Sequence, residues 1–170
     1  MKIGLLSDTH SYLDPRIFDF FSECEEIWHA GDIGDSKVSD ELMAFKPFKA
    51  VYGNIDDQSI RIQFPLNLLF TCEGIKVFIT HIGGYPGKYT KRVREILRKE
   101  KSQLYICGHS HILKVMHDKS LDLLHINPGA CGNHGFHKMK TIIRFDIIDS
   151  QIKNLEVIEL GKRGGIEHFK

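Results

Sequence analysis

Short apolar runs alternate with amphipathic segments through the first third of the chain. Three such runs, each followed by polar residues, predict buried strands at Lys2–Ser7, Glu26–His29 and Phe48–Tyr52. Between them, Pro15–Phe21 and Ser36–Phe45 carry apolar residues at helical spacing. Asp14 and Ser36 are the candidate N-caps, and Pro15 suits the first helical position. The alternation of strand and helix predicts parallel βαβ units and a layered α/β fold.

The rest of the chain is richer in strand-like runs. Leu66–Cys72 and Ile75–Thr80 flank Glu73-Gly74, a turn signal that predicts a hairpin. Tyr89–Lys101 has helical spacing. Further strands are predicted at Leu104–Cys107, Leu113–His117, Leu121–Ile126, Thr141–Ile148 and Ile152–Leu160. An α/β first half followed by a hairpin-rich second half predicts two facing sheets with helices outside. Since no linker-like segment interrupts the pattern, we expect a single domain over residues 1–170.

Composition and charge narrow the function classes. The 170 residues are 42% hydrophobic and 26% charged, with a net charge of +1. The chain lacks the basic excess that is typical of nucleic-acid-binding proteins, so stable nucleic-acid binding is not expected. A nucleotide substrate stays open. No apolar run approaches a membrane span and no signal peptide is recognised, which predicts a cytoplasmic protein without a membrane partner. Reduced thiols, rather than disulfides, are expected at the scattered Cys24, Cys72, Cys107 and Cys131.

Metal-capable side chains follow five of the apolar, strand-like runs. These polar segments are Ser7-Asp8-Thr9-His10, Gly31-Asp32, Gly53-Asn54, Thr80-His81 and Gly108-His109-Ser110-His111. Because ligands of α/β sheets bind at the carboxyl ends of the strands, we expect these side chains to share one rim. Mixed nitrogen and oxygen donors suit Mn, Fe, Co or Zn. Seven ligands exceed the usual four of one Zn, whereas with one shared carboxylate they fit two cations roughly 3.5–4 Å apart.

Each of these residues also has an ordinary structural explanation when it is taken alone. Asp8 could cap a turn, Asn54 after a glycine is often a turn residue, and His81 could be a core histidine. Their combination favours a metal site. Among the other histidines, packing or solvent roles are expected for His29, His117, His125 and His168. The glycine-rich loop 127–137 could border the pocket and bring His134 or His137 to a substrate.

The motifs in this order resemble those of the calcineurin-like metallophosphoesterase superfamily. The short length and the sequence Gly53-Asn54-Ile55-Asp56 resemble its small bacterial and archaeal phosphodiesterase branch in particular. The resemblance implies a fold of the α/β (α+β) class, namely a four-layer αββα sandwich of two mixed β-sheets flanked by helices. It also implies a phosphodiesterase that acts on a small-molecule phosphodiester, with homo-oligomer formation left open.

The resemblance further implies a role for each motif residue. The first metal would be held by Asp8, His10, Asp32 and His111, and the second by Asp32, Asn54, His81 and His109. Asp32 would bridge the metals. Asp32, Asn54 and Asp56 would form the catalytic site, and Asp56 would orient it through hydrogen bonds. Two divalent ions are implied, with Mn expected and Ni, Fe, Zn or Co as alternatives. A hydroxide bridging them would attack phosphorus in line.

One departure from the family bears on mechanism. In larger relatives the residue after the motif asparagine is a histidine thought to protonate the leaving group, whereas here it is Ile55. We therefore expect a preference for good leaving groups, or proton transfer through water or another histidine. The alternatives are a phosphomonoesterase, for which Arg61 and Lys88 are candidate charge contacts, an exonuclease, and a non-catalytic scaffold like the retromer subunit that resembles this branch.

Overall fold

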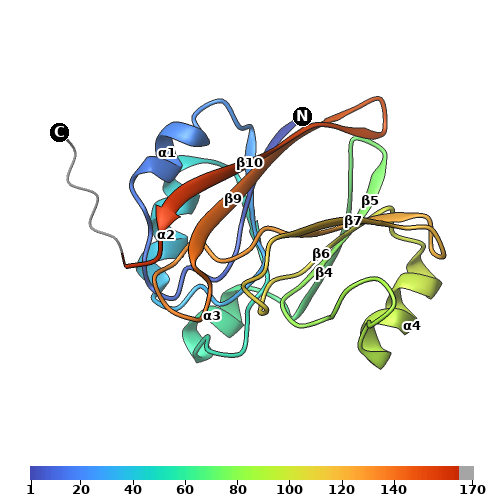
Figure 1. Cartoon of the computed structure of the whole chain (residues 1–170), viewed down its shortest axis with the longest axis horizontal. Helices are drawn as coiled ribbons and strands as arrows, with labels where there is room; N and C mark the ends of the chain where they lie inside the picture. Colours follow the sequence, from blue (N-terminus) through green and yellow to red (C-terminus); the bar gives the residue numbers. More distant parts are fainter. Residues whose placement is uncertain (165–170) are drawn as a thin grey trace.

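Two five-stranded mixed sheets face each other in the computed structural model, which describes residues 1–164 (Figure 1). The first sheet has the order β10-β9-β1-β2-β3 and the second β4-β5-β6-β8-β7. The first sheet consists of β1 (Lys2–Leu6), β2 (Glu26–His29), β3 (Phe48–Ala50), β9 (Met139–Ile148) and β10 (Gln151–Lys162). The second consists of β4 (Asn67–Cys72), β5 (Ile75–Thr80), β6 (Leu104–Ile106), β7 (Lys114–Asp118) and β8 (Leu123–Asn127).

Alternating side chains of both sheets form the main core. Successive residues of a strand point to opposite faces, so Val77 and Ile79 of β5 face the first sheet while Phe78 faces outward. The first sheet contributes Leu5 and Trp28 to the same inner core, and all five side chains are fully buried. This inner layer holds the two sheets together.

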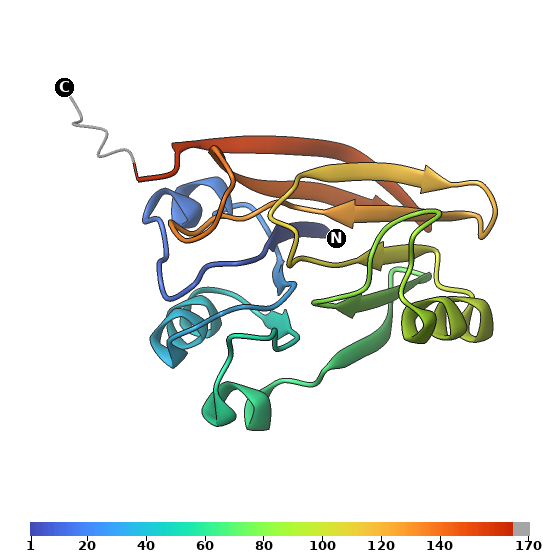
Figure 2. The same cartoon turned by 60° about the horizontal axis from the view of Figure 1, so that its bottom comes forward.

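Helices cover the outer faces of the two sheets. The outer face of the first sheet packs against α1 (Arg16–Phe20) and α2 (Ser36–Phe45), through residues such as Ile17 and Leu42. The second sheet packs against α4 (Lys91–Glu100) through Val93. Figure 2 shows the blue helices at one side of the molecule and the yellow-green α4 at the other. The four-layer αββα arrangement of two mixed sheets is therefore confirmed.

The element boundaries agree with the sequence-based predictions within about two residues, as expected for frayed ends. Three details were wrong. The N-cap of α2 is Asp35, whose carboxylate accepts from Lys37 N, and Ser36 is already helical. The N-cap of α1 is Pro15 rather than Asp14, so Pro15 is not the first helical residue. The short α3 (Gln58–Gln63), capped by Asp57, was not predicted, because one turn and a half buries too few apolar side chains to set up a period.

The predicted hairpin is confirmed. β4 and β5 pair antiparallel with Cys72 opposite Ile75, and both turn residues, Glu73 and Gly74, adopt positive φ, as a tight two-residue hairpin turn requires. Parallel pairing joins β1, β2 and β3 in one sheet and β5, β6 and β8 in the other. The carboxyl ends of these strands therefore lie at one rim. Over residues 1–164, no helix is long and apolar enough to cross a membrane.

Candidate metal centre

The seven side chains singled out in the sequence converge at this rim, on the loops that follow β1, β2, β3, β5 and β6. Five of them have a left-handed backbone, with φ between 47° and 68°: Asp8, His10, Asp32, His109 and His111. This conformation is uncommon for residues with a side chain, although Asp and His tolerate it better than most. Its concentration here indicates that the loops are held in strained shapes to aim these side chains inward.

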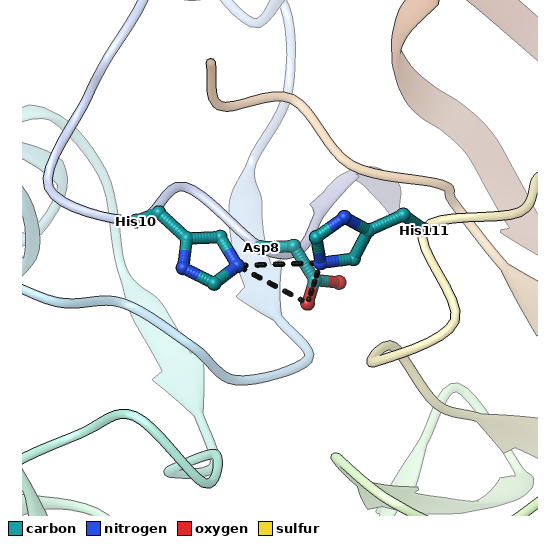
Figure 3. Close-up of side chains that lie close together, drawn as sticks. All are labelled: Asp8, His10 and His111. Atoms are coloured by element: carbon teal, nitrogen blue, oxygen red, sulfur yellow. Dashed lines mark hydrogen bonds and ion pairs between the residues drawn. The ribbon is translucent and has the colours of Figure 1, made fainter. Parts of the chain in front are cut away.

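Asp8, His10 and His111 form the first cluster of donor atoms (Figure 3). Oδ1 of Asp8 lies 3.1 Å from Nε2 of His111, and the Nε2 atoms of His10 and His111 are 3.2 Å apart. Asp8 is fully buried, whereas both histidines are partly exposed. Three donor atoms thus face one small volume that is open on the histidine side.

Asp32, His81 and His109 form the second cluster. Oδ2 of Asp32 lies 3.2 Å from Nε2 of His81. Nε2 of His81 is also 3.2 Å from Oδ1 of Asn54, which adds a neutral amide oxygen to the set. The ring of His109 lies edge-on to that of His81, with 5.3 Å between the ring centroids. All four residues that the family resemblance assigned to the second metal therefore lie together.

Asp32 connects the two clusters. Its Oδ2 is 3.2 Å from Nε2 of His81 in the second cluster and 3.6 Å from Nε2 of His10 in the first. Its other oxygen, Oδ1, accepts a hydrogen bond of 3.0 Å from the backbone N–H of Ile55. One carboxylate oxygen is thus tied to the protein, and the other faces both clusters.

The two carboxylate oxygens of Asp8 also differ in their contacts. Its Oδ2 accepts hydrogen bonds from the hydroxyl of Ser7 at 2.7 Å and from the backbone N–H of His109 at 3.2 Å. Within the part of the chain that the structure describes, its buried Oδ1 accepts no hydrogen bond. A buried carboxylate oxygen without a donor is costly unless a positive charge compensates it. The set of buried carboxylates and imidazole nitrogens therefore fits divalent cations.

Hydrogen bonds behind the clusters set the orientation of the donors. Nδ1 of His81 lies 2.8 Å from the carbonyl oxygen of Ala30, to which it can donate, so that the Nε2 lone pair faces the cluster. Metal-ligating histidines commonly have such a partner on the second nitrogen. The buried carboxylate of Asp56 accepts from the N–H groups of Gly34 and Gly53, each at 2.7 Å, and so joins the loops after β2 and β3. Asp56 itself is absent from both clusters.

His29 packs beneath the site, as the sequence suggested. Its Nδ1 accepts a hydrogen bond from Gly31 N at 3.1 Å, so in the neutral ring Nε2 carries the proton, and it lies 3.0 Å from the hydroxyl oxygen of Thr9. The Thr9 hydroxyl donates in turn to the carbonyl of Ile33 at 2.9 Å. Full burial of His29 lowers its pKa to about 4, so the neutral ring is the form that fits this chain of bonds.

Small residues let the loops approach closely. A Cβ atom on Gly53 would lie 2.1 Å from Oδ1 of Asp32, which is far inside contact distance. Gly31 has a φ of 95°, and a Cβ there would lie 2.7 Å from His81. The glycine before each of Asp32 and Asn54 is therefore needed to bring the side chains of the second cluster together.

Burial and the attraction between carboxylates and imidazoles shift the pKa values of His81, Asp32 and His10 in opposite directions. Burial alone would lower the pKa of His81, but the carboxylates of Asp32 and Asp8 raise it overall. Burial alone would raise the pKa of Asp32, but hydrogen bonds from His81 and from Ile55 N lower it. His10 differs, because burial dominates over its carboxylate neighbours and lowers its pKa. At His81 the attraction of the carboxylates therefore outweighs burial, whereas at His10 burial outweighs it.

The glycine-rich loop after β8 does border the site. The ring centroid of His134 is 5.1 Å from that of His10, and the centroid of His137 is 5.2 Å from that of His111. Within the loop, Phe136 is fully exposed. The sequence left open whether these histidines approach the metal site, and the structure brings both rings to the edge of the first cluster.

His117, His125 and the four cysteines lie apart from the clusters. His125 is buried and stacks on Tyr105, and the half-exposed His117 pairs with Asp122 at 3.3 Å. His168 lies outside the described residues. The four cysteines are all buried and unpaired, and burial raises the pKa of the Cys107 thiol to about 12. Cys107 is therefore a packed strand-end residue.

Comparisons with known proteins agree with this geometry. Residues 1–150 match the model of the "calcineurin-like phosphoesterase superfamily domain". A probable metallophosphoesterase of Methanothermobacter thermautotrophicus is 32% identical over 137 residues, which are 76% of this chain and 77% of the relative. A solved structure described as a novel archaeal phosphodiesterase superposes with a TM-score of 0.74 at 26% identity, covering 94% of this chain and 100% of that one.

A more distant structural neighbour shares the fold alone. Vps29 of Entamoeba histolytica, solved in complex with Zn²⁺, has a TM-score of 0.71 at 16% identity, with 94% of this chain and 99% of Vps29 covered.

Proposed function

Since this chain belongs to the calcineurin-like phosphoesterase superfamily, we propose that it is a phosphodiesterase that uses two divalent cations. One observation carries the proposal: Oδ2 of Asp32 faces His10 of the first cluster and His81 of the second. A shared carboxylate is the arrangement that places two cations close enough to act on one phosphate. The archaeal relative described as a phosphodiesterase supports the choice of a diester.

The residues divide between two sites. Asp8, His10 and His111 would hold the first cation, and Asn54, His81 and His109 the second, with Asp32 common to both. Mn is the expected ion, and Ni, Fe, Zn and Co are the alternatives, since imidazole combined with carboxylate suits these metals. When bound, the two cations would acidify a water molecule and neutralise negative charge on the phosphate oxygens.

The chain's own residues then position the reaction. Ile55 N holds one oxygen of Asp32, and the Ser7 hydroxyl holds one oxygen of Asp8. In each carboxylate the other oxygen is thereby oriented inward. Asp56 keeps the loop that carries Asn54 in register with the loop that carries Asp32. Hydrolysis forms a bond from the water oxygen to phosphorus and breaks one phosphorus–ester bond, and the departing oxygen takes up a proton.

The side chain of Ile55 has no proton to donate to the departing oxygen, and it is 46% exposed beside the site. We therefore expect good leaving groups to react fastest, or a proton to be delivered through water. His134 lies near His10 and is a candidate contact for the substrate.

The test is metal reconstitution followed by two parallel assays. The purified chain is stripped of metal, Mn, Ni, Zn or Mg is added back separately, and an activated aryl phosphodiester is assayed beside the matching monoester. The proposal predicts diester hydrolysis that exceeds monoester hydrolysis and disappears in Asp32→Ala. Faster monoester hydrolysis would instead identify a phosphomonoesterase. Binding of two metals without cleavage of either ester would contradict an enzymatic role and favour a scaffold.

A further inference from the structure

A cavity of about 410 Å³ opens directly beside the second cluster. Asn54 and His81 form part of its wall, and Tyr52, Leu66 and Ile82 supply apolar surface. Two arginine side chains complete the lining, Arg61 from α3 and Arg92 from α4, and we call this cavity the arginine pocket. The arginine pocket therefore shares Asn54 and His81 with the second cluster.

Arg61 is held over the loop that carries Asn54. Its Nε donates to the carbonyl of Asp56 at 2.7 Å, and its Nη2 donates to the carbonyl of Asn54 at 3.2 Å. The guanidinium also lies over the ring of Tyr52, 4.9 Å from the centroid. These contacts fix the planar group while using only part of its five N–H donors.

Arg92 is held in the same manner over the loop that carries His81. Its Nη2 donates to the carbonyl of Ile82 at 2.7 Å and to the hydroxyl of Thr80 at 3.2 Å, and its Nη1 donates to the side chain of Asn67. Both arginines are thus anchored on backbone or neutral groups next to a candidate metal ligand. Over residues 1–164, neither arginine is anchored by a carboxylate.

The two arginines have no carboxylate partner among the described residues. No Asp or Glu lines the arginine pocket, and within residues 1–164 neither Arg61 nor Arg92 forms an ion pair with a carboxylate. Guanidinium groups with remaining N–H donors match the paired oxygens of a phosphate. Two fixed positive charges beside apolar walls are suited to an organic arm that ends in an anion.

We propose that the arginine pocket selects phosphodiesters in which one ester arm carries a second phosphate, such as a short oligonucleotide with a terminal phosphate. The inference rests on the proposed function and specifies its substrate class. The ring or sugar of the arm would pack on Tyr52, Leu66 and Ile82, while Arg61 and Arg92 bind its terminal phosphate. The volume is in the range of pockets that bind small organic ligands, roughly 300–1,000 Å³.

A matched pair of substrates tests the selection. The metal-loaded enzyme is assayed with a dinucleotide that carries a 5′-terminal phosphate and with the same dinucleotide without it. The terminal phosphate should raise kcat/KM by about tenfold or more, since charge-assisted hydrogen bonds are stronger than neutral ones. In Arg61→Gln the ratio of the two kcat/KM values should fall toward one. Equal values in the unmodified enzyme would overturn the inference.

A matched control separates the pocket from a general effect of charge. Arg98 lies on α4 like Arg92 but is exposed and lines a different depression, so Arg98→Gln should keep the ratio of the unmodified enzyme. If Arg98→Gln lowers the ratio as much as Arg61→Gln, long-range attraction explains the preference and the inference fails. Arg61 is itself exposed, so Arg61→Gln decides the matter even if Arg92→Gln disturbs the contacts of β4 and β5.

A binding measurement without catalysis distinguishes this inference from the proposed function. The metal-free chain is titrated calorimetrically with adenosine 5′-monophosphate and with adenosine. We expect the monophosphate to bind about tenfold more tightly, and Arg61→Gln to remove the difference. That result would support the pocket even if no diester were cleaved with any metal. Equal affinities would overturn the pocket even if diester hydrolysis were observed.

Discussion

The backbone N–H of Ile55 donates a 3.0 Å hydrogen bond to Oδ1 of Asp32 and thereby turns Oδ2 toward both clusters of donor atoms. The bond places the proposed bridging carboxylate under the control of the neighbouring loop. It also shows that Ile55 acts through its backbone, so the identity of its side chain is free to vary without loss of this contact. Replacing Ile55 with a side chain that can donate a proton should therefore alter proton transfer while the metal centre stays intact.

The first prediction concerns the leaving group. Because the Ile55 side chain carries no proton, the rate for a series of aryl phosphodiesters should fall steeply as the pKa of the leaving phenol rises. Ile55→His should flatten this dependence and accelerate the poorest leaving groups by about tenfold or more. The slope of log kcat/KM against leaving-group pKa measures the effect, and Ile55→Val is the control. A flat slope in the unmodified enzyme would show that another residue already donates the proton.

The second prediction concerns the close approach of Gly53 to Asp32. A Cβ on Gly53 would lie 2.1 Å from Oδ1 and 2.4 Å from the backbone nitrogen of Asp32, so Gly53→Ala must displace the carboxylate. We expect metal affinity to fall about 10–100-fold, the usual effect of disturbing a ligand's support. Gly87→Ala, where a Cβ meets open space, should cost some stability through its φ of 85° and leave affinity unchanged. Equal metal affinities of Gly53→Ala and the unmodified chain would contradict this prediction.

The third prediction separates positioning from metal binding at Asp56. Asp56→Asn keeps the shape but offers only one acceptor oxygen to the N–H groups of Gly34 and Gly53, so the two loops should separate. Activity and metal affinity should fall about 10–100-fold, while the number of metals bound at saturation stays the same. Asp57→Asn is the control, since Asn also caps helices well. Loss of one metal at saturation would instead make Asp56 a ligand.

The fourth prediction concerns stability. Burial alone would raise the pKa of Asp14, but hydrogen bonds from Arg16 and from the buried Lys140 outweigh it and lower the pKa to about 2. Removing one partner of a buried ion pair costs about 3–5 kcal/mol, so Asp14→Asn should lower the free energy of unfolding by that order. The exposed Asp19→Asn should change it little.

The pH dependence of Asp14 has a definite sign. A carboxyl whose folded pKa is depressed contributes stability above its unfolded pKa, near 3.8, and loses that contribution as the pH falls through about 2. Urea unfolding between pH 5 and pH 2 should therefore show a component in the unmodified chain that Asp14→Asn lacks. Parallel pH profiles of the two proteins would contradict the assignment.

The sequence predicted the layered fold and the convergence of the seven donor side chains for the same reason. Buried strands have short apolar runs, and the residues that follow parallel strands meet at one rim, so local patterns were sufficient. The resemblance to a family then assigned the donors to two sets. An apolar pattern does not show which oxygen of Asp32 accepts a hydrogen bond from a backbone N–H. The structure of the loop around Ile55 was needed to identify it.

Other features depend on contacts between segments far apart in the chain. His134 reaches His10 because the loop after β8 folds back over the loop after β1. The glycine-rich sequence suggested that this loop borders the pocket, but no local signal shows which histidine it brings to His10. Arg61 and Arg92 meet in one pocket although they are on different helices, and α3, which carries Arg61, is too short to show a period. The candidate donor set could therefore be found from sequence, whereas the surface that would select a substrate could not.

The most direct test of the central claim is a titration of the metal-free chain with Mn²⁺ while hydrolysis of an activated aryl phosphodiester is followed. If Asp32 joins two sites into one centre, activity should reach its maximum at two equivalents of Mn²⁺ per chain, and Asp32→Ala should show no comparable rise. Activity that saturates at one equivalent, or two bound equivalents without hydrolysis, would contradict the account.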